Sequence, residues 1–433
     1  MRISPLLGSS LLGWLAAFGC LAGCDDALPG VWPTPSRATA GEAGGAPETI
    51  AGGGAGGIAP DLVIDPPAPP PDEEIASLAI PNALQAKAMR YLNRGYNLTN
   101  WLESGKFRGF APYDESYVAR LRQAGFTALR LPIDLDLYVD QRTVDGTEVS
   151  LELSPDLFTV LDAFDQWTER YGLSFTIDYH QYDKSFDMAD AAGVAETVEL
   201  WSAVAQHFAG NSREDLFFEL MNEPEQFASG TPPTAAQWTA LAEGMVAAIR
   251  AHDNVHTIIF GDVQWYGISA LTQRTPLTDP NVVYAFHFYE PFVFTHQGAS
   301  WAGMASTHDI PYPYSMERWS VYSGDFGFTQ VTEAWLWSSL RNYYRTGSKS
   351  ALRNQIIRAK RWAVQHDVPV ICNEFGAYDR SSQPADRVRY YTDLVDIFTE
   401  LEIPWQHWFM LMDATTGAVN SEYSAAFQLV PGP

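Results

Sequence analysis

Short β-rich runs alternate with longer amphipathic segments from residue 90 onward, and this alternation restricts the fold more than any other feature. One parallel strand can follow another only after a crossover segment, which is usually a helix. The alternation therefore predicts a parallel sheet with helices between its strands. The eight predicted strands are Tyr91–Leu98, Ala128–Ile133, Ser174–Tyr179, Leu216–Leu220, Thr257–Asp262, Val282–Phe288, Pro369–Asn373 and Trp405–Met410.

Helical periodicity marks the segments between these strands. Ser154 suits an N-cap and Pro155 suits the first helical position that follows it. Eight β-then-α units in about 345 residues predict an α/β fold, a (β/α)8 TIM barrel, with a doubly wound sheet as the weaker alternative. The barrel is expected over residues 81–433 as a single catalytic domain. The predicted helices are Pro155–Tyr171, Glu196–Phe208, Ala235–Ala251, Ala351–His366, Ala385–Leu401 and a short one at Glu422–Phe427.

The N-terminal 80 residues carry a different signal. A basic start and an apolar stretch from Leu6 to Leu21 predict a signal peptide over residues 1–23. Leu21-Ala22-Gly23-Cys24 resembles a bacterial lipobox, in which Cys24 becomes the lipidated first residue of the mature protein; an ordinary secretory signal is the alternative. Of the 31 residues from Gly41 to Pro71, 21 are Gly, Ala or Pro, so residues 24–80 are interpreted as a tether that cannot form a core.

Composition excludes several classes of protein. With 27 Lys+Arg against 52 Asp+Glu, the net charge is −25, which argues against nucleic acid as a partner. Once Cys20 is removed and Cys24 acylated, Cys372 is the remaining thiol and no intrachain disulfide is expected. No metal-ligand spacing or nucleotide fingerprint appears, so we expect neither a metal nor a cofactor. We also expect a monomer that is attached to the membrane through its lipid alone. A cell-envelope location follows, at the outer membrane or cell surface, or else periplasmic or secreted.

A barrel places its chemistry at the carboxyl ends of its strands. Two of the polar residues expected there are glutamates, Glu223 in Asn222-Glu223-Pro224 and Glu374 in Asn373-Glu374-Phe375-Gly376. Glycoside hydrolysis needs one protonated and one ionised carboxyl on either side of the anomeric carbon. A cation such as Arg130 would keep one of them ionised. Either glutamate alone could instead cap a helix, but that explanation is weak for both together.

These motifs resemble the cellulase-like glycoside hydrolase family 5 over residues 90 to 430. Gly95-Tyr96-Asn97-Leu98-Thr99-Asn100-Trp101-Leu102-Glu103 would open the barrel, and Leu129-Arg130-Leu131-Pro132-Ile133 would be strand two. The loop Tyr289–Trp301 looks like the strand-six loop of a bacterial endoglucanase and mannanase branch.

The resemblance implies a role for individual residues. Glu223 would be the acid/base and Glu374 the nucleophile of a retaining mechanism. Asn222 would hydrogen-bond the sugar 2-hydroxyl, and Arg130 and Tyr289 would hold Glu374 charged and oriented. The remaining residues implied to line the substrate are His180, His287, Trp408, Asn100, Glu103, His296 and Trp301.

Two departures from the family pattern bear on specificity. The branch often has two adjacent histidines after strand three, and here the second place, also expected to bind substrate, is Gln181. The aromatic-rich segment from Ala302 to Tyr344 would either add sugar-stacking subsites or cover the side of the barrel. His207, His252, His256, His366 and His407 are interpreted as structural.

The predicted function is a lipid-anchored, retaining endo-β-1,4-glucanase. An endo-β-1,4-mannanase or an exo-acting β-glycosidase of the same family is the close alternative. From other classes, the alternatives are a surface carbohydrate-binding lipoprotein without activity and a purely structural envelope lipoprotein.

Overall fold

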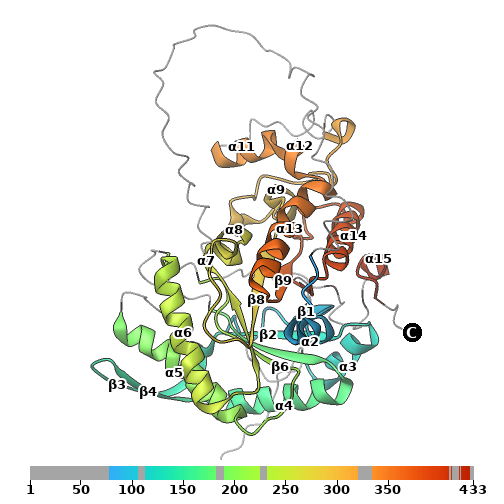
Figure 1. Cartoon of the computed structure of the whole chain (residues 1–433). Coiled ribbons are helices and arrows are strands. Elements are labelled where there is room, and N and C mark those ends of the chain that lie inside the picture. The colour runs from blue at the N-terminus through green and yellow to red at the C-terminus, as the bar shows by residue number, and fades with distance from the viewer. Residues whose placement is uncertain are drawn as a thin grey trace, which may run out of the picture.

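A computed structural model describes residues 78–105, 113–181, 190–224, 232–319, 334–408, 411, 419 and 421–429. Its main sheet contains eight parallel strands in the order β10-β1-β2-β5-β6-β7-β8-β9, forming a nearly closed barrel (Figure 1). This confirms the (β/α)8 prediction. The strands are β1 (Gly95–Asn97), β2 (Ala128–Ile133), β5 (Ser174–Tyr179), β6 (Leu216–Glu219), β7 (Thr257–Gly261), β8 (Val282–Phe288), β9 (Val370–Phe375) and β10 (Gln406–His407).

Helices connect successive strands, and several of the long ones begin at a side chain that accepts a backbone hydrogen bond, as Ser154 was predicted to do. Ser154 accepts a hydrogen bond from the backbone N–H of Asp156, and Gly172 ends the helix in the left-handed conformation at φ 67°. Thr234 and Gln237 form a reciprocal capping box. The helices are α2 (Ala83–Tyr91), α3 (Glu115–Gln123), α4 (Pro155–Tyr171), α5 (Ala191–Phe208), α6 (Ala235–His252), α7 (Val263–Tyr266), α8 (Ile268–Leu271), α9 (Phe292–Thr295), α11 (Ala334–Arg341), α12 (Tyr343–Thr346), α13 (Lys349–His366), α14 (Pro384–Glu400) and α15 (Ser421–Ser424), with 3-10 turns η1 (Leu135–Tyr138) and η2 (Ser300–Ala302).

The start of the barrel differs from the prediction. Tyr91 was expected to begin strand one, but it ends helix α2, and β1 starts only at Gly95. Asn82 caps this helix by accepting a hydrogen bond from Gln85 N–H, which favours helix over strand. Ala88 and Leu92 then pack in one buried cluster with strand side chains that include Phe217, Ile259, Val283 and Ile371. The helix thus covers apolar side chains that would otherwise meet water.

A two-stranded antiparallel hairpin, β3 (Val139–Asp145) and β4 (Glu148–Leu153), follows β2 and was not predicted. Its side chains are mostly exposed, so it lacks the apolar run by which barrel strands are recognised. Gly146, at φ 65°, lies in its turn, where the left-handed region favours glycine. Arg142 forms an ion pair with Glu196 of α5. The hairpin is therefore an addition to the loop between β2 and α4.

The structure describes the two ends of the barrel domain in part. Leu78 and Ile80 are 6% and 5% exposed and belong to the core, so packing begins just before the expected boundary at residue 81. Phe409 and Met410, expected to continue the last strand, lie outside the described residues. The signal peptide, Cys24 and most of the tether lie outside them as well. Within the described ranges, every helix is too short or too polar to cross a lipid bilayer.

The main sheet closes at β9 and β10. Cys372 and Trp405 form an isolated parallel bridge, and two backbone hydrogen bonds support it, from Cys372 N–H to Pro404 O (3.0 Å) and from Trp408 N–H to Phe375 O (2.9 Å). The Asn97 side chain adds a link at the same place. Its Nδ2 donates to the backbone oxygens of Asn373 (3.1 Å) and His407 (3.0 Å). One amide thus ties β1 to both strands of the seam.

Candidate active site

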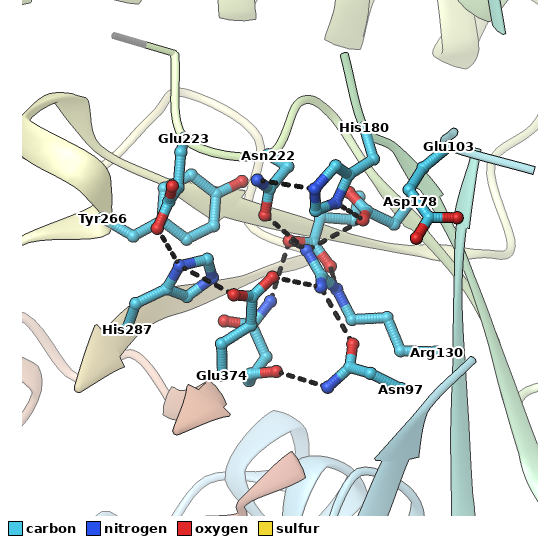
Figure 2. Close-up of polar contacts among 12 residues, drawn as sticks. Asn97, Glu103, Arg130, Asp178, His180, Asn222, Glu223, Tyr266, His287 and Glu374 are labelled. Carbon is cyan, nitrogen blue, oxygen red and sulfur yellow. Dashed lines mark hydrogen bonds and ion pairs between the residues drawn. The ribbon is translucent and has the colours of Figure 1, made fainter. Parts of the chain in front are cut away.

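Arg130 of β2 lies at the centre of the cluster of polar side chains (Figure 2). Its guanidinium is fully buried and contacts three carboxylates, those of Asp178 (2.9 Å), Glu219 (2.7 Å) and Glu374 (2.6 Å). It also donates to the amide oxygens of Asn97 and Asn222, both at 2.9 Å. Arg130 therefore holds side chains from β1, β5, β6 and β9 in fixed positions.

Strand register explains why these side chains meet. Asp178 of β5 pairs with Glu219 of β6, and His287 of β8 pairs with Glu374 of β9. Neighbouring residues on paired parallel strands point to the same face of a sheet. Each pair therefore brings two titratable groups to the interior of the barrel near its carboxyl end.

The sequence analysis did not predict Asp178 and Glu219 as site residues, because it considered mainly the residues that follow the strands. Both are 0% exposed and lie inside apolar strands, two residues before His180 and four before Glu223. A signal was present in the sequence, because a lone carboxylate in a buried strand needs a cation. Arg130 on β2 is that cation, one strand away from Asp178 and two strands away from Glu219. Asn373, also outside the predicted set, donates to Glu219 Oε1 at 2.7 Å.

Glu374 has the contacts expected of a group that must be ionised. Its Oε1 accepts from Arg130 Nη1 at 2.6 Å, and its Oε2 accepts from the Tyr289 hydroxyl at 3.0 Å. Burial raises the pKa of Glu374, and the neighbouring Glu223 adds to the rise, while the positive charge of Arg130 opposes it. Both predicted partners of this carboxylate, Arg130 and Tyr289, therefore contact it directly.

Glu223 has a different environment. Its backbone is in the left-handed region at φ 39°, which is strained for a residue with a side chain and is typical of functional sites. Its Oε1 lies 2.6 Å from Nδ1 of His287. Burial raises the pKa of Glu223 to about 8, with Arg130 as the opposing charge. Near neutral pH, Glu223 is therefore a protonated acid.

The two glutamates lie close together. One carboxylate oxygen of Glu223, one of Glu374 and a ring nitrogen of His287 all lie within 4.8 Å of one another. Such a set could hold a divalent cation, but the hydrogen bond between His287 Nδ1 and Glu223 Oε1 accounts for the same spacing. Burial lowers the pKa of His287 to about 4, so this imidazole is neutral. The site thus brings a proton donor within reach of a carboxylate held by a cation.

His180 and Trp408 form a second part of the site. The rings are stacked, with centroids 5.4 Å apart and planes 12° from parallel. His180 Nδ1 lies 2.9 Å from Asp178, and its Nε2 lies 3.3 Å from the Asn222 amide nitrogen. The histidine therefore links a stacking surface to the residue before the acid.

The other predicted substrate residues lie in the loops after the strands. Glu103 is 2% exposed and accepts hydrogen bonds from the backbone N–H groups of Asn100 and Trp101. It holds Asn100 in the left-handed conformation at φ 62°, and burial raises the pKa of Glu103 to about 7. Gln181 donates to Asp136 at 2.7 Å. Substrate contact by Glu103, Asn100 and Gln181 stays a prediction.

His296 and Trp301 follow β8. His296 stacks on Phe292 at 4.0 Å, and its ring also lies edge-on to the Tyr289 ring at 5.4 Å. Trp301 meets Tyr378 edge-on at 4.7 Å, three residues beyond the end of β9. His296 therefore lies beside Tyr289, a hydrogen-bond partner of Glu374, and Trp301 lies beside a residue of the loop after β9. Contact of either residue with sugar stays a prediction.

The insertion after β8 is described at residues 302–319 and 334–344. Tyr312 and Tyr343 are 0% exposed, and Tyr314 packs against both Trp319 and Tyr343. These contacts favour a covering role for those four aromatics. In Figure 1, α11 and α12 lie above α9 and α13, at the opposite end of the view from α4. Three more aromatics of this segment are Tyr322, which lies outside the described residues, and Trp335 and Trp337 in α11.

Comparisons with known proteins agree with this arrangement. Residues 91–412 match the family model described as cellulase (glycosyl hydrolase family 5). Endoglucanase 3 of Fibrobacter succinogenes is 49% identical over 358 residues, covering 81% of this chain and 54% of the relative. The chain thus spans about half the length of that relative. Endoglucanase C of Acetivibrio thermocellus is 25% identical over 328 residues, covering 72% of this chain and 90% of the relative.

Solved structures share the fold. Endoglucanase Cel5A from Thermotoga maritima superimposes with a TM-score of 0.64 at 23% identity, covering 79% of this chain and 99% of that one. Structures of that protein include complexes with cellobiose and with mannotriose.

Proposed function

The chain belongs to the cellulase family, glycosyl hydrolase family 5, and on that premise we propose that it is a retaining endo-β-1,4-glucanase. The observation that carries the proposal is the pairing of Glu223 with Glu374. Their nearest carboxylate oxygens lie within 4.8 Å of each other. Carboxyl groups of retaining enzymes lie about 5–5.5 Å apart, while inverting enzymes leave about 6.5–9.5 Å for a water molecule. The short separation supports retention.

The different environments of the two carboxyls support distinct roles. Glu223 carries a proton near neutral pH and can transfer it to the glycosidic oxygen as the bond to the leaving sugar breaks. Glu374, held by Arg130 and Tyr289, supplies the electron pair that forms a bond to the anomeric carbon. Glu223, now ionised, takes a proton from water. The resulting hydroxide equivalent attacks the same carbon and releases Glu374, so configuration is retained.

The substrate proposal rests on the relatives. A glucan cleaved internally is the substrate that the name endoglucanase gives for the 49% identical relative, and the β-1,4 linkage is part of our proposal. His180 and Trp408 supply a stacked aromatic surface suited to the apolar face of a sugar ring. A β-mannan is the alternative substrate, because mannose differs from glucose by an axial 2-hydroxyl next to the reacting carbon. An exo mode of attack is the alternative to internal cleavage.

A substrate panel tests the proposal. The protein is incubated with barley β-glucan, carboxymethylcellulose, glucomannan, galactomannan and xylan, and both viscosity and product lengths are followed. An endo-glucanase lowers the viscosity of the glucans early and releases mixed oligosaccharides. Higher turnover on galactomannan would replace the glucanase by a mannanase, and a single short product would indicate exo action. If no glycan is cleaved, while Glu374→Ala binds glucan as well as the wild type, the protein is a binding lipoprotein.

We also propose that a lipid on Cys24 attaches the enzyme to the bacterial cell envelope. The support is sequence alone: a short apolar stretch ends at Leu21-Ala22-Gly23-Cys24, and a tether rich in Gly, Ala and Pro follows. Cys24→Ser should release the full chain from the membrane fraction into soluble fractions without detergent. Cys20→Ser is the matched control and should leave fractionation unchanged. Equal membrane association of Cys24→Ser and the wild type would refute the proposal that a lipid on Cys24 anchors the enzyme.

A further inference from the structure

Asp178 takes no part in the chemistry described above, although its side chain is completely buried within the site. It lies on β5 two residues before His180, so both side chains point to the same face of the strand. One oxygen, Oδ2, contacts both Arg130 Nη2 and His180 Nδ1, each at 2.9 Å. A single acceptor atom thus joins the central cation to a histidine at the sugar-stacking surface.

This contact determines which nitrogen of His180 carries the proton. Burial lowers the pKa of His180 to about 3, so the ring is neutral and has one N–H group. Burial raises the pKa of Asp178 to about 7, but Oδ2 faces the Arg130 guanidinium, so a proton on this carboxyl occupies Oδ1. Oδ2 therefore accepts hydrogen bonds in either state, which places the N–H of His180 at Nδ1. Nε2 is then an acceptor, and the Asn222 amide nitrogen 3.3 Å away must donate to it.

The amide of Asn222 is consequently fixed at both ends. Its oxygen accepts from Arg130 Nη2 at 2.9 Å, while its nitrogen donates to His180 Nε2. A flipped amide would place its NH2 group against the guanidinium and its oxygen against a nitrogen lone pair. The observed orientation leaves the second N–H of Asn222 for another acceptor, beside the acid Glu223.

We propose that Asp178 is a positioning residue that acts through His180 to orient the Asn222 amide toward the 2-hydroxyl of the sugar being cleaved. The proposal rests on the glycosidase function proposed above. Asp178 need not touch substrate, because its contribution is the Oδ2 atom that accepts a hydrogen bond from His180 Nδ1. Hydrogen bonds to the 2-hydroxyl strengthen in the transition state of glycoside hydrolysis, so misorientation of the amide slows the reaction more than it weakens binding.

Two substitutions separate the acceptor from the charge. Asp178→Asn keeps an oxygen at the position that contacts His180 and Arg130. Its amide nitrogen takes the place of the Asp178 Oδ1 atom, which has no hydrogen-bond partner in the described part of the chain. Asp178→Ala removes the acceptor as well. On an aryl β-cellobioside, the Ala variant should lose at least about tenfold in kcat/KM, less than the hundredfold or more that removal of a transition-state donor costs. The Asn variant should remain within about threefold of wild type, since its acceptor is retained.

The matching 2-deoxy glycoside is the decisive substrate, because its ring has no 2-hydroxyl to contact. On this 2-deoxy substrate, the kcat/KM values of Asp178→Ala and the wild type should differ by less than about twofold. Glu219→Gln is the matched control: Glu219 also binds Arg130 but not His180, and its loss should affect both substrates equally. An equal loss for Asp178→Ala on both substrates, or an Asn variant as slow as the Ala variant, would overturn the proposal.

The tautomer can be read in the wild-type protein even if Asp178→Ala does not fold. The ¹⁵N resonances of His180, assigned by comparison with His180→Gln, should show a protonated Nδ1 and an unprotonated Nε2. The opposite tautomer would overturn the proposal. A wild type inactive on every glucan and mannan would refute the proposed function instead, whatever the tautomer, so the two failures are distinguishable.

Discussion

Two parallel hydrogen bonds join Glu219 to Arg130, from Nε to Oε2 at 2.7 Å and from Nη2 to Oε1 at 2.8 Å. A bidentate pair fixes the plane of the guanidinium as well as its position. With that plane fixed, Nη1 faces Glu374 at 2.6 Å. The carboxylate of Glu374, the proposed nucleophile, is therefore positioned by a second carboxylate at the other edge of the arginine.

Glu219→Gln tests this relationship. The variant should lose about tenfold or more in kcat with a smaller change in KM, because small misplacements of a reacting group are costly. Steady-state kinetics on β-glucan measures both constants. Glu400→Gln, which weakens the Arg353–Glu400 pair between α13 and α14, is the control and should leave kcat unchanged. A normal kcat for Glu219→Gln would show that Glu374 is positioned without the bidentate pair.

The two catalytic glutamates should differ in their response to the leaving group. Glu374→Ala should abolish turnover of every substrate, since no covalent intermediate can form. Glu223→Ala should still react with an activated aryl glycoside, whose leaving group needs little protonation, and give a fast burst followed by slow hydrolysis. Stopped-flow detection of the phenolate measures the burst. A burst from Glu374→Ala alone would reverse the two assignments.

Activity should fall as the pH rises through about 8. Burial raises the pKa of Glu223 to about 8, and the protonated form is the active one in the first step, so the alkaline limb follows its loss. The pH profile of kcat/KM on β-glucan locates this limb. It should be absent for the activated aryl glycoside, whose first step needs no acid. A limb at the same pH on both substrates would assign it to another group.

Glu223→Gln should stabilise the folded protein at neutral pH. The folded-state pKa is raised from 4.5 to about 8, so the unfolded chain releases a proton that the folded chain keeps. Stability is therefore lost as the pH rises between those values, on the order of 3 kcal/mol at pH 7. Urea unfolding at pH 5 and pH 7 should show a gain for the variant that is larger at pH 7. Glu169→Gln, at an exposed position of α4, should show no such pH-dependent gain.

Arg130→Met should make stability depend more steeply on pH. Asp178, Glu219 and Glu374 all contact this one guanidinium, and removal of one partner of a buried ion pair costs about 3–5 kcal/mol. Without the cation, the folded-state pKa values of the three carboxyls rise further, so stability should decline as the pH rises from 5 to 8. Urea unfolding of both proteins across that range measures the slope. If stability falls with pH at the same slope in Arg130→Met and the wild type, groups other than Arg130 balance the charges of the three carboxyls.

The sequence predicted the barrel and both glutamates because each leaves a strong local signal. Strands buried on both faces are continuous apolar runs. Glu374, expected just after such a run, lies within its last two residues in β9, and Glu223 follows the end of β6 by four residues. Asp178 and Glu219 escaped notice because their importance depends on strand register, which pairs them across β5 and β6. Helix α2 was taken for a strand since its burial depends on partners more than a hundred residues away, such as Phe217 and Ile371.

Asn97 links the closure of the barrel to the proposed active site. Its amide joins β1 to residues Asn373 and His407, which follow it by 276 and 310 positions in the chain. The same residue accepts a hydrogen bond from Arg130 through its side-chain oxygen. The amide that meets the last strand through its nitrogen thus meets Arg130 through its oxygen. A substitution at Asn97 would therefore weaken barrel closure and remove one partner of the guanidinium that contacts Glu374, so the two effects cannot be separated at this position.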